Sequence, residues 1–385
     1  MSFKVNTEKQ VKHIEDINSS INDLDLDSVT LIRGKTPQDI NQWCLQLCKD
    51  YLSGEWIQQT VDTITVSRIT VGVTNQMYCC AINEPNGQSL VPQVVAIRLY
   101  GKKYFLHNND RLVDTVIALM MSTMKIGPKM YGIFDQGQIL QFYNHRPFKI
   151  NEQNNAKLVR QVFEKLAQIH AMDVPIKRNT NWLLDELDIS LAAIYASQRS
   201  TVDDIKQLFN SYRCPTLLSC DFPSETQWIK DVIKRTNSPV VFTHNDYRSD
   251  NLMVIESPDS VNNQSIVVCD FDYSAYGYRG YDFALILREW HRKRYIDVRD
   301  VDGIPQDDQI VRPLIEIYVN KCNDIHGSDY SANDVNSVDH ILYEIKVFQM
   351  VLSFFGTIHT LKLDLENQGF FGETNKLVGI FNKFS

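Results

Sequence analysis

The chain has 385 residues, 43% of them hydrophobic, and a formal net charge of −8 at pH 7. That length is enough for two domains, or for one bilobed unit with an ample core. Acidic residues outnumber basic ones and no large Lys/Arg cluster offsets them, which argues against nucleic acid or a stable membrane association. The eight cysteines are scattered, with no Cys-x-x-Cys pair and no paired Cys/His spacing. This predicts a reduced intracellular protein without a zinc site.

The N-terminal segment, residues 1–35, is polar and is predicted to be a lead-in to the folded part. It is charged from its first residues and lacks the apolar core of a signal peptide. No run approaches the ~20 apolar residues of a transmembrane helix. Near the C-terminus, Gln349 and Ser353 interrupt the longest apolar stretch, Val347–Phe355. A cytoplasmic location is therefore expected.

Residues 36–145 are predicted to form a small lobe built on strands. Thr36 is expected to cap a helix at its N-terminus, with Pro37 in the first turn and Gly54 after its end. The lobe boundary is placed near residue 145. Short runs rich in β-branched residues predict strands at 63–70, 77–82, 94–100, 130–134 and 138–143.

Residues 146–385 are predicted to be mainly helical. The segment 155–172 carries apolar residues on one helical face, and His170 near its end is expected to make a structural hydrogen bond. Two further helical regions follow: 200–236, broken by Pro215 and Pro223, and 335–363.

A hairpin in the second half of the chain gathers polar residues. The runs Asn251–Ile255 and Ser265–Cys269 read as strands joined by a polar loop. Carboxylates crowded at one edge repel one another unless a cation neutralises them, and oxygen ligands suit Mg²⁺. The residues concerned are His244, Asp246 and Asn251 at one end of the pairing, and Asp270 and Asp272 at the other.

The spacing of these residues indicates phosphoryl transfer. His-x-Asp-x-x-x-x-Asn, followed by a strand that ends in Asp-Phe, is the layout of kinase-like enzymes. In that layout Asp246 accepts or orients the proton of the attacking hydroxyl, while Asn251 and Asp270 bind Mg²⁺. Asp272 is either a second metal ligand or a brace for the loop. The alternative interpretation is a solvated hairpin that happens to be acidic.

The motifs HNDYRSDNLMV, DFDYSAYGYRGYDFA and REW resemble the choline/ethanolamine kinase family, and the resemblance runs from about Trp43 to the C-terminal helix. It implies a bilobed, protein-kinase-like α+β fold, with a small antiparallel-sheet N-lobe and a mainly helical C-lobe. It also implies ATP and Mg²⁺ as cofactors and transfer of the γ-phosphoryl group to choline, giving phosphocholine for phospholipid synthesis. It further implies ethanolamine as a second or alternative substrate, and a homodimer is compatible with the family.

The same resemblance assigns nucleotide contacts in the N-lobe. Gly72, Thr74 and Asn75 match part of the family's phosphate-covering turn, in which Val71 replaces a glycine. Arg98 ends a Val-Ala-Ile-Arg strand, where a guanidinium can hold phosphate by two hydrogen bonds.

Two further N-lobe features follow from the resemblance. Asp114 aligns with the helix Glu that aims this basic residue, but it is one methylene shorter, and a solvated Asp in the first turn of the helix is the alternative. Gln141, Phe142 and Tyr143 match the hinge whose backbone meets the adenine edge.

The family binds the substrate ammonium among aromatic faces and a carboxylate. Tyr273 and Glu289 match such positions, and Tyr295 is offset from a third by one residue. Phe355 stands where the family has the first Trp of Trp-Gly-x-Trp, and Ile358 replaces the second. For Phe355 a plain core position is the alternative.

Other functions remain open from the sequence. One is ethanolamine kinase, or a broader amino-alcohol or aminoglycoside-type phosphotransferase. Another is a catalytically inactive kinase-like binding module. Few glycines at 71–75 and the shorter Asp114 favour that module, whereas the intact Asp246, Asn251 and Asp270 argue against it.

Overall fold

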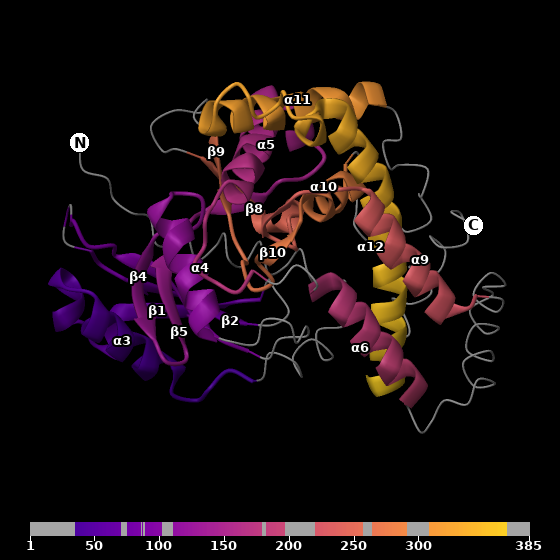
Figure 1. The fold of residues 1–385 in the computed structure, drawn as a ribbon. Helices are drawn as coiled ribbons and strands as arrows, with labels where there is room; N and C mark the ends of the chain where they lie inside the picture. The colour runs from indigo at the N-terminus through magenta and orange to yellow at the C-terminus, as the bar shows by residue number, and fades with distance from the viewer. Residues whose placement is uncertain are drawn as a thin grey trace.

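The computed structural model describes residues 35–70, 75–85, 87, 89–101, 111–178, 182–196, 220–256, 264–290 and 308–367. Within these ranges the chain forms the predicted α+β architecture, a small lobe of antiparallel strands beside a mainly helical lobe (Figure 1). Three predicted site residues, Gly72, Thr74 and Tyr295, lie outside the described residues, as does the lead-in segment 1–34.

The small lobe is built on a five-stranded antiparallel sheet in the order β1-β2-β3-β5-β4. The register places Arg98 opposite Met77 on one neighbour and Gln138 on the other, so these three side chains share a face. The strands are β1 (Ile64–Ile69), β2 (Gln76–Ile82), β3 (Val94–Leu99), β4 (Met130–Phe134) and β5 (Gly137–Gln141), each within two residues of its prediction at both ends.

Helix α3 (Ile40–Tyr51) packs on the sheet face opposite Arg98, where its buried side chains meet Val95 and Ile97. The predicted cap of this helix is wrong. Asp39 occupies the N-cap position, whereas the Thr36 hydroxyl accepts a 2.7 Å hydrogen bond from Arg68 of β1. A tertiary contact therefore takes the hydroxyl that the local pattern assigned to the helix end.

The strands of the large lobe converge on one place. β8 (Leu252–Glu256) and β9 (Gln264–Val268) form the predicted hairpin, and β6 (His145–Pro147) extends it on the other edge of β8. β7 (Val240–Thr243) pairs with β10 (Ala275–Tyr278). β7 leads into the HNDYRSDN segment, β8 follows that segment, and β9 leads into the acidic DFD segment.

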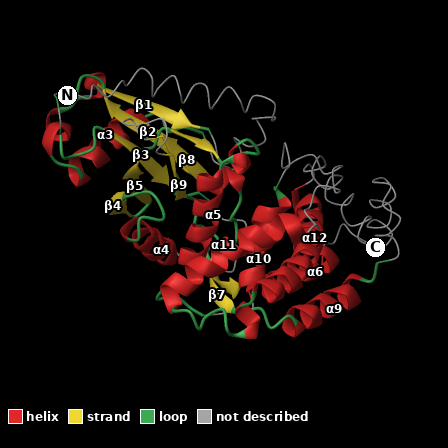
Figure 2. Cartoon of the chain, turned by 90° about the horizontal axis from the view of Figure 1, so that it is seen from above, coloured by secondary structure: helices red, strands yellow, loops and turns green. Residues whose placement is uncertain are grey.

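Helices make up the rest of the large lobe. Within it, α11 packs on α5, and α12 packs on α10 and α6 (Figures 1 and 2). The helices are α5 (Ala156–His170), α6 (Trp182–Ala196), α9 (Phe222–Arg235), α10 (Arg279–Arg288), α11 (Asp308–His326) and α12 (Val338–Asn367), while α4 (Arg111–Thr123) belongs to the small lobe. Short 3-10 segments occur at Gly54–Gln58, Val61–Thr63, Glu152–Asn154, Ser249–Asn251 and Asp334–Asn336.

Two predictions about these helices can be compared with the structure. The helix predicted at 155–172 is α5, which Asn155 caps by accepting hydrogen bonds from the backbone of Lys157 and Leu158 at 3.1 and 3.3 Å. Pro223 does not break a helix as predicted, because it lies in the first turn of α9, where its missing N–H is not needed. Most of the region around Pro215 lies outside the described residues.

The long helix α12 is largely apolar, although no apolar run of transmembrane length was expected here. Its segment Val338–His359 has a mean hydropathy of 1.4, and by length and composition alone it is long enough to cross a membrane. In the structure 72% of that window is buried inside the protein. Packing against α10 and α6 accounts for its apolar character.

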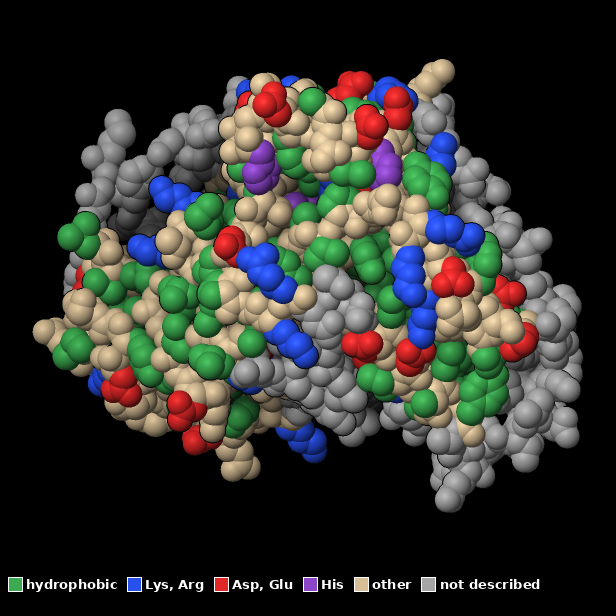
Figure 3. All heavy atoms as spheres, viewed as in Figure 1, with side chains coloured by type: hydrophobic (Ala, Val, Ile, Leu, Met, Phe, Trp, Pro, Cys, Tyr) green, Lys and Arg blue, Asp and Glu red, His purple; other side chains and the backbone are tan. Residues whose placement is uncertain are grey.

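Charged side chains of both signs are interspersed on the face shown in Figure 3. Arg279 and Glu344 are different, because both side chains are fully buried. Arg279 Nη2 lies 2.5 Å from Glu344 Oε1, and the guanidinium also donates to the Asn336 side chain and to the Val335 carbonyl. This ion pair ties the start of α10 to α12.

Replacing Arg279 by Met should lower the free energy of unfolding by about 3–5 kcal/mol, because Glu344 would keep a buried charge without its partner. The matched control is Arg312→Met, whose 2.6 Å ion pair with Asp339 is largely exposed. It should cost about 1 kcal/mol or less. Urea unfolding followed by circular dichroism measures both, and equal losses would contradict this account.

Candidate active site

The HNDYRSDN segment is held by one buried carboxylate. Asp282, in the first turn of α10, accepts hydrogen bonds from the backbone N–H groups of His244 and Asn245, both at 2.8 Å. Asn245 has a φ of 64°, a left-handed conformation that needs such support. His170 donates to the same carboxylate at 3.2 Å and bonds Tyr318 at 2.9 Å, which confirms its structural role.

His244 links this segment to the end of β9. Its Nδ1 accepts from the Asp246 backbone at 3.3 Å, and its Nε2 lies 3.0 Å from the Cys269 carbonyl. Burial lowers the pKa of His244, which favours the neutral ring, and these partners place the proton on Nε2. The imidazole therefore fixes the spacing between Asp246 and the residue after Cys269, which is Asp270.

Asp246 and Asn251 form a pair, as their spacing predicts. Asn251 Nδ2 donates to the Asp246 backbone carbonyl at 2.9 Å and to Asp246 Oδ2 at 2.7 Å. The Asp246 side chain is 23% exposed, so a small molecule can reach it. The orientation of the amide leaves Asn251 Oδ1 as its oxygen ligand for a cation.

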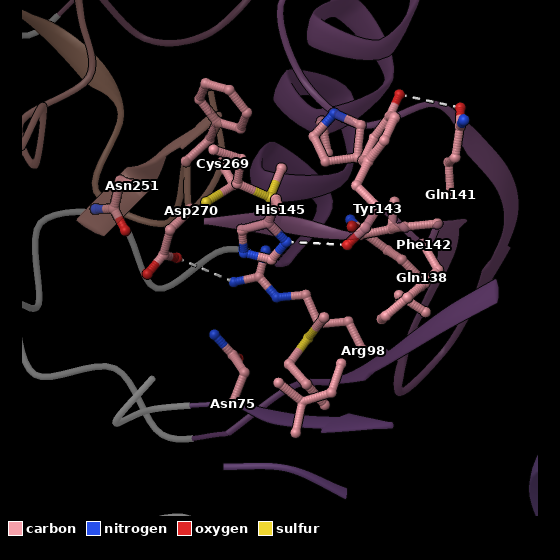
Figure 4. Close-up of a pocket in the computed structure, with 18 of the residues that line it drawn as sticks. Asn75, Arg98, Gln138, Gln141, Phe142, Tyr143, His145, Asn251, Cys269 and Asp270 are labelled. Atoms are coloured by element: carbon pink, nitrogen blue, oxygen red, sulfur yellow. Dashed lines mark hydrogen bonds and ion pairs between the residues drawn. The ribbon is translucent and has the colours of Figure 1, made fainter. Parts of the chain in front are cut away.

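The other end of the hairpin meets Arg98. Arg98 Nη2 lies 3.3 Å from Asp270 Oδ1 (Figure 4) and 2.6 Å from Asp272 Oδ1, so the small lobe and the large lobe are joined by ion pairs here. Burial opposes the charge of Arg98, but Asp272 and Asp270 outweigh it and raise its pKa. The two acids thus offset the cost of burying the charge of Arg98.

The two acids at this end differ in what they can bind. Both oxygens of Asp272 are engaged, Oδ1 by Arg98 and Oδ2 by Asn75 Nδ2 at 2.8 Å, and Asp272 is only 3% exposed. Asp270 has a φ of 62° and a side chain that is 38% exposed. Of the two roles predicted for Asp272, this geometry favours the brace.

The charge around Asp270 suits a cation. Partial burial of the carboxylate, followed by the charge of the neighbouring Asp272, raises the pKa of Asp270 to about 6, while Arg98 opposes the shift. Asn251 lies beside Asp270 in Figure 4 and offers a neutral oxygen. Among the described residues, no three His, Cys, Asp or Glu side chains converge to hold a metal ion unaided. The donors fit Mg²⁺ only with oxygens from a phosphorylated ligand, which is how this ion is commonly bound.

Asp114 is buried rather than solvated, so the alternative proposed for it is wrong. Its Oδ2 accepts a 2.9 Å hydrogen bond from Arg111. It also contributes to the raised pKa of Arg98, after Asp272 and Asp270. Asp114 therefore supports Arg98 through its charge, while the ion pairs recorded for Arg98 run to Asp270 and Asp272.

A cavity of about 220 Å³ lies between the lobes, next to these groups. Ala96 and Leu140 of the small lobe and Met253 and Phe271 of the large lobe give it apolar walls suited to a flat ring. Its polar residues include Asn75, Arg98, Asp250, Asn251 and Asp270.

The predicted hinge residues Gln141, Phe142 and Tyr143 line the cavity. The Gln141 N–H already donates to the Lys129 carbonyl at 2.8 Å. The Tyr143 hydroxyl donates to the Gln141 side chain at 3.0 Å, and the Tyr143 carbonyl contacts His145 Nδ1 at 3.0 Å. Because the backbone N–H of Gln141 is already bonded, an adenine ring would contact other groups of this segment.

Two of the predicted substrate residues, Glu289 and Tyr273, lie against the HNDYRSDN segment. The Glu289 carboxylate is buried and accepts a 2.7 Å hydrogen bond from the Ser249 N–H, and burial raises its pKa. The Tyr273 carbonyl accepts from Asn245 Nδ2 at 2.8 Å, and its side chain is half-buried. Both residues thus contact the HNDYRSDN segment directly.

Phe355 lies in an aromatic cluster of the large lobe. It is 4% exposed, with its ring centroid 6.3 Å from Trp182 and 6.4 Å from Tyr281, both edge-to-face, and it stacks on His359. Such rings offer faces to a cation but also form a stable core.

Two residues were missed by the sequence analysis. Asp282 supports the start of the HNDYRSDN segment, and its signal was a single acid beside the apolar run that follows it in α10. Arg248 contacts Asp246 at 3.0 Å and Asp250 at 2.9 Å, and its signal was a lone cation among the acids of the motif.

The chain matches a known protein family over most of its length. Residues 66–371 match the family model described as choline/ethanolamine kinase. A rat choline/ethanolamine kinase is 29% identical over 66% of this chain and 61% of its own length, so the match spans less than two thirds of that relative. Choline kinase A2 of Caenorhabditis elegans is 24% identical over 93% of this chain and 87% of its own.

A solved structure supports the fold. Plasmodium vivax ethanolamine kinase superposes with a TM-score of 0.65 at 18% sequence identity, covering 97% of this chain and 94% of that one. The protein-kinase-like fold is thereby confirmed. From the family match and this fold, the chain belongs to the choline/ethanolamine kinase family.

Proposed function

We propose that the protein transfers the γ-phosphoryl group of ATP to the hydroxyl of an amino alcohol, with choline as the main substrate. The observation that carries this proposal is the convergence of Asp246, Asn251 and Asp270 beside a cavity between the lobes. Ethanolamine kinase is the second candidate, because Glu289 supplies a carboxylate suited to an ammonium with N–H donors.

The cavity supports nucleotide binding. Its apolar walls suit adenine, and Arg98 lies where a guanidinium would hold phosphate oxygens. Asn251 and Asp270 would hold Mg²⁺, which when bound neutralises phosphate charge. The Asn75 side chain lines the cavity but is bonded to Asp272 and to the Gly101 N–H, so its role in this proposal is to brace the phosphate end.

Asp246 acts as the base in this proposal. The alcohol hydroxyl binds at the Asp246 carboxylate and gives up its proton to an Asp246 oxygen. The alcohol oxygen forms a bond to the γ-phosphorus, the bond from that phosphorus to the β–γ bridging oxygen breaks, and ADP leaves. Asn251 Nδ2 orients the carboxylate through its 2.7 Å hydrogen bond. Location in the cytoplasm and assembly as a homodimer complete the proposal.

The direct test is a kinase assay with Mg·ATP across choline, ethanolamine and an aminoglycoside. Phosphorylation of choline with a higher kcat/KM than ethanolamine supports the proposal. Preference for ethanolamine makes the second candidate correct. Nucleotide binding without turnover of any alcohol would identify an inactive binding module.

Asp246→Asn keeps the shape of the side chain but removes the proton acceptor. We expect kcat to fall by ~10²–10⁴-fold, with ATP binding little changed. Steady-state kinetics and nucleotide titration measure the two effects. A variant that keeps more than about half of the wild-type kcat would show that Asp246 is not the base.

Asp270→Ala should abolish activity at every Mg²⁺ concentration, because the exposed carboxylate at the end of β9 is lost. Asp272→Ala should lower kcat and stability but leave the Mg²⁺ concentration for half-maximal rate unchanged, because both Asp272 oxygens serve as braces. The measurement is rate against Mg²⁺ for each variant. An active Asp270→Ala beside an inactive Asp272→Ala would reverse the two assignments.

Phe355→Leu should lower kcat/KM for choline several-fold more than for ethanolamine. A partly desolvated cation–π contact is worth ~1–2 kcal/mol, or roughly 5–30-fold, and choline's methyl groups favour aromatic faces. The matched control is Phe348→Leu on the same helix, since Phe348 is fully buried against Gly280. It should lower stability without changing the substrate ratio. If Phe355→Leu also leaves the ratio unchanged, Phe355 is a core residue.

A further inference from the structure

Arg248 occupies a position that the mechanism above does not use. Its Nε lies 3.0 Å from Asp246 Oδ1 and its Nη1 lies 2.9 Å from Asp250 Oδ2, so one guanidinium bridges the base and a second acid. Asn251 Nδ2 holds the other oxygen of Asp246 at 2.7 Å. Each oxygen of the base is thus already in contact with a donor.

Of the two ion pairs of Arg248, the one with Asp250 is the more exposed to water. Asp250 has a side chain that is 55% exposed, and ion pairs of that kind contribute little because water competes with them. A phosphoryl group carries more charge than one carboxylate and offers several acceptor oxygens, which guanidinium groups bind well. A phosphorylated ligand near Arg248 would therefore displace these carboxylates.

Arg248 lies next to the nucleotide cavity, because its guanidinium contacts Asp250, one of the residues that line it. Asp250 and Asn251, which follow Arg248 closely along the chain, both line the cavity. The side chain of Arg248 is 27% exposed and is not locked inside the core.

We propose that Arg248 binds the transferring phosphoryl group and, in moving to it, releases Asp246 Oδ1 to accept the hydroxyl of the alcohol. The proposal rests on the proposed function and adds a phosphoryl-binding residue that couples the two substrates. A nucleotide that carries a γ-phosphoryl group strengthens alcohol binding, and ADP does not. The coupling is reciprocal, as linkage requires.

The test is calorimetric titration without turnover, using Mg·ADP and the magnesium complex of a non-hydrolysable ATP analogue with an imido β–γ bridge. Arg248→Gln should weaken binding of the analogue by roughly ten- to a hundredfold, the loss expected for a charged hydrogen bond. Binding of Mg·ADP should change by less than about twofold, and Arg248→Lys should restore part of the affinity for the analogue. The matched control is Arg160→Gln, whose 3.7 Å pair with Glu164 lies on the surface of α5.

Asp250→Asn provides a second variant that should fold normally, because the residue is exposed. Removing this competing acid should leave affinity for the analogue equal to or greater than that of the wild type. In the wild type, choline titrated in the presence of the analogue should bind several-fold more tightly than in the presence of ADP, and Arg248→Gln should remove that difference.

Three results would overturn the inference: equal losses of ADP and analogue binding in Arg248→Gln, no loss of either, or loss of the analogue in Asp250→Asn. Each of these leaves the proposed function standing if the wild type phosphorylates choline. Failure of the wild type to bind either nucleotide would instead refute the proposed function, and the inference with it.

Discussion

The buried carboxylate of Asp282 is the constraint on which the site depends. It accepts two backbone hydrogen bonds from His244 and Asn245 and a third from His170, so a segment with a left-handed residue is held without help from regular structure. Burying a charge is costly unless it is fully hydrogen-bonded, and three donors meet that requirement. Once His244 is fixed, its ring sets the distance from the catalytic segment to the end of β9. The geometry of the proposed active site thus follows from one acid that need not touch a substrate.

The second constraint is charge. Asp246, Asp250, Asp270 and Asp272 lie close together, and their ion pairs divide them between two guanidinium groups. Arg98 contacts Asp270 and Asp272, beside the proposed metal site, and Arg248 contacts Asp246, the proposed base, and Asp250. Arg98 comes from the small lobe, so the same ion pairs that offset repulsion also join the lobes around the cavity. Phosphates and a divalent cation would enter a site in which carboxylates and guanidinium groups are already paired and can exchange these partners for the ligand.

Much of this site was predictable because its signals are local. The spacing from His244 to Asn251, followed by a strand ending before Asp270, brings Asp246, Asn251 and Asp270 together once the hairpin forms. The strands of the small lobe were predictable for the same reason. The rest depends on tertiary contacts that local patterns cannot report. Thr36 bonds Arg68 instead of capping its helix, Asp114 is buried beside Arg111, and Asp282 reaches a segment far away in the sequence. The orientation of Arg248 toward Asp246 and Asp250 also depends on contacts that the local pattern does not report.

The most direct test of the account is a crystal structure with Mn²⁺ and a non-hydrolysable ATP analogue, using anomalous scattering to locate the metal. The account predicts a Mn²⁺ peak bound by an Asp270 oxygen and by Asn251 Oδ1, with the remaining ligands supplied by phosphate and water. It also predicts that Asp272 keeps its contacts with Arg98 and Asn75. A metal bound by Asp272 without Asp270, or a nucleotide bound with no metal peak between Asn251 and Asp270, would contradict the central claim.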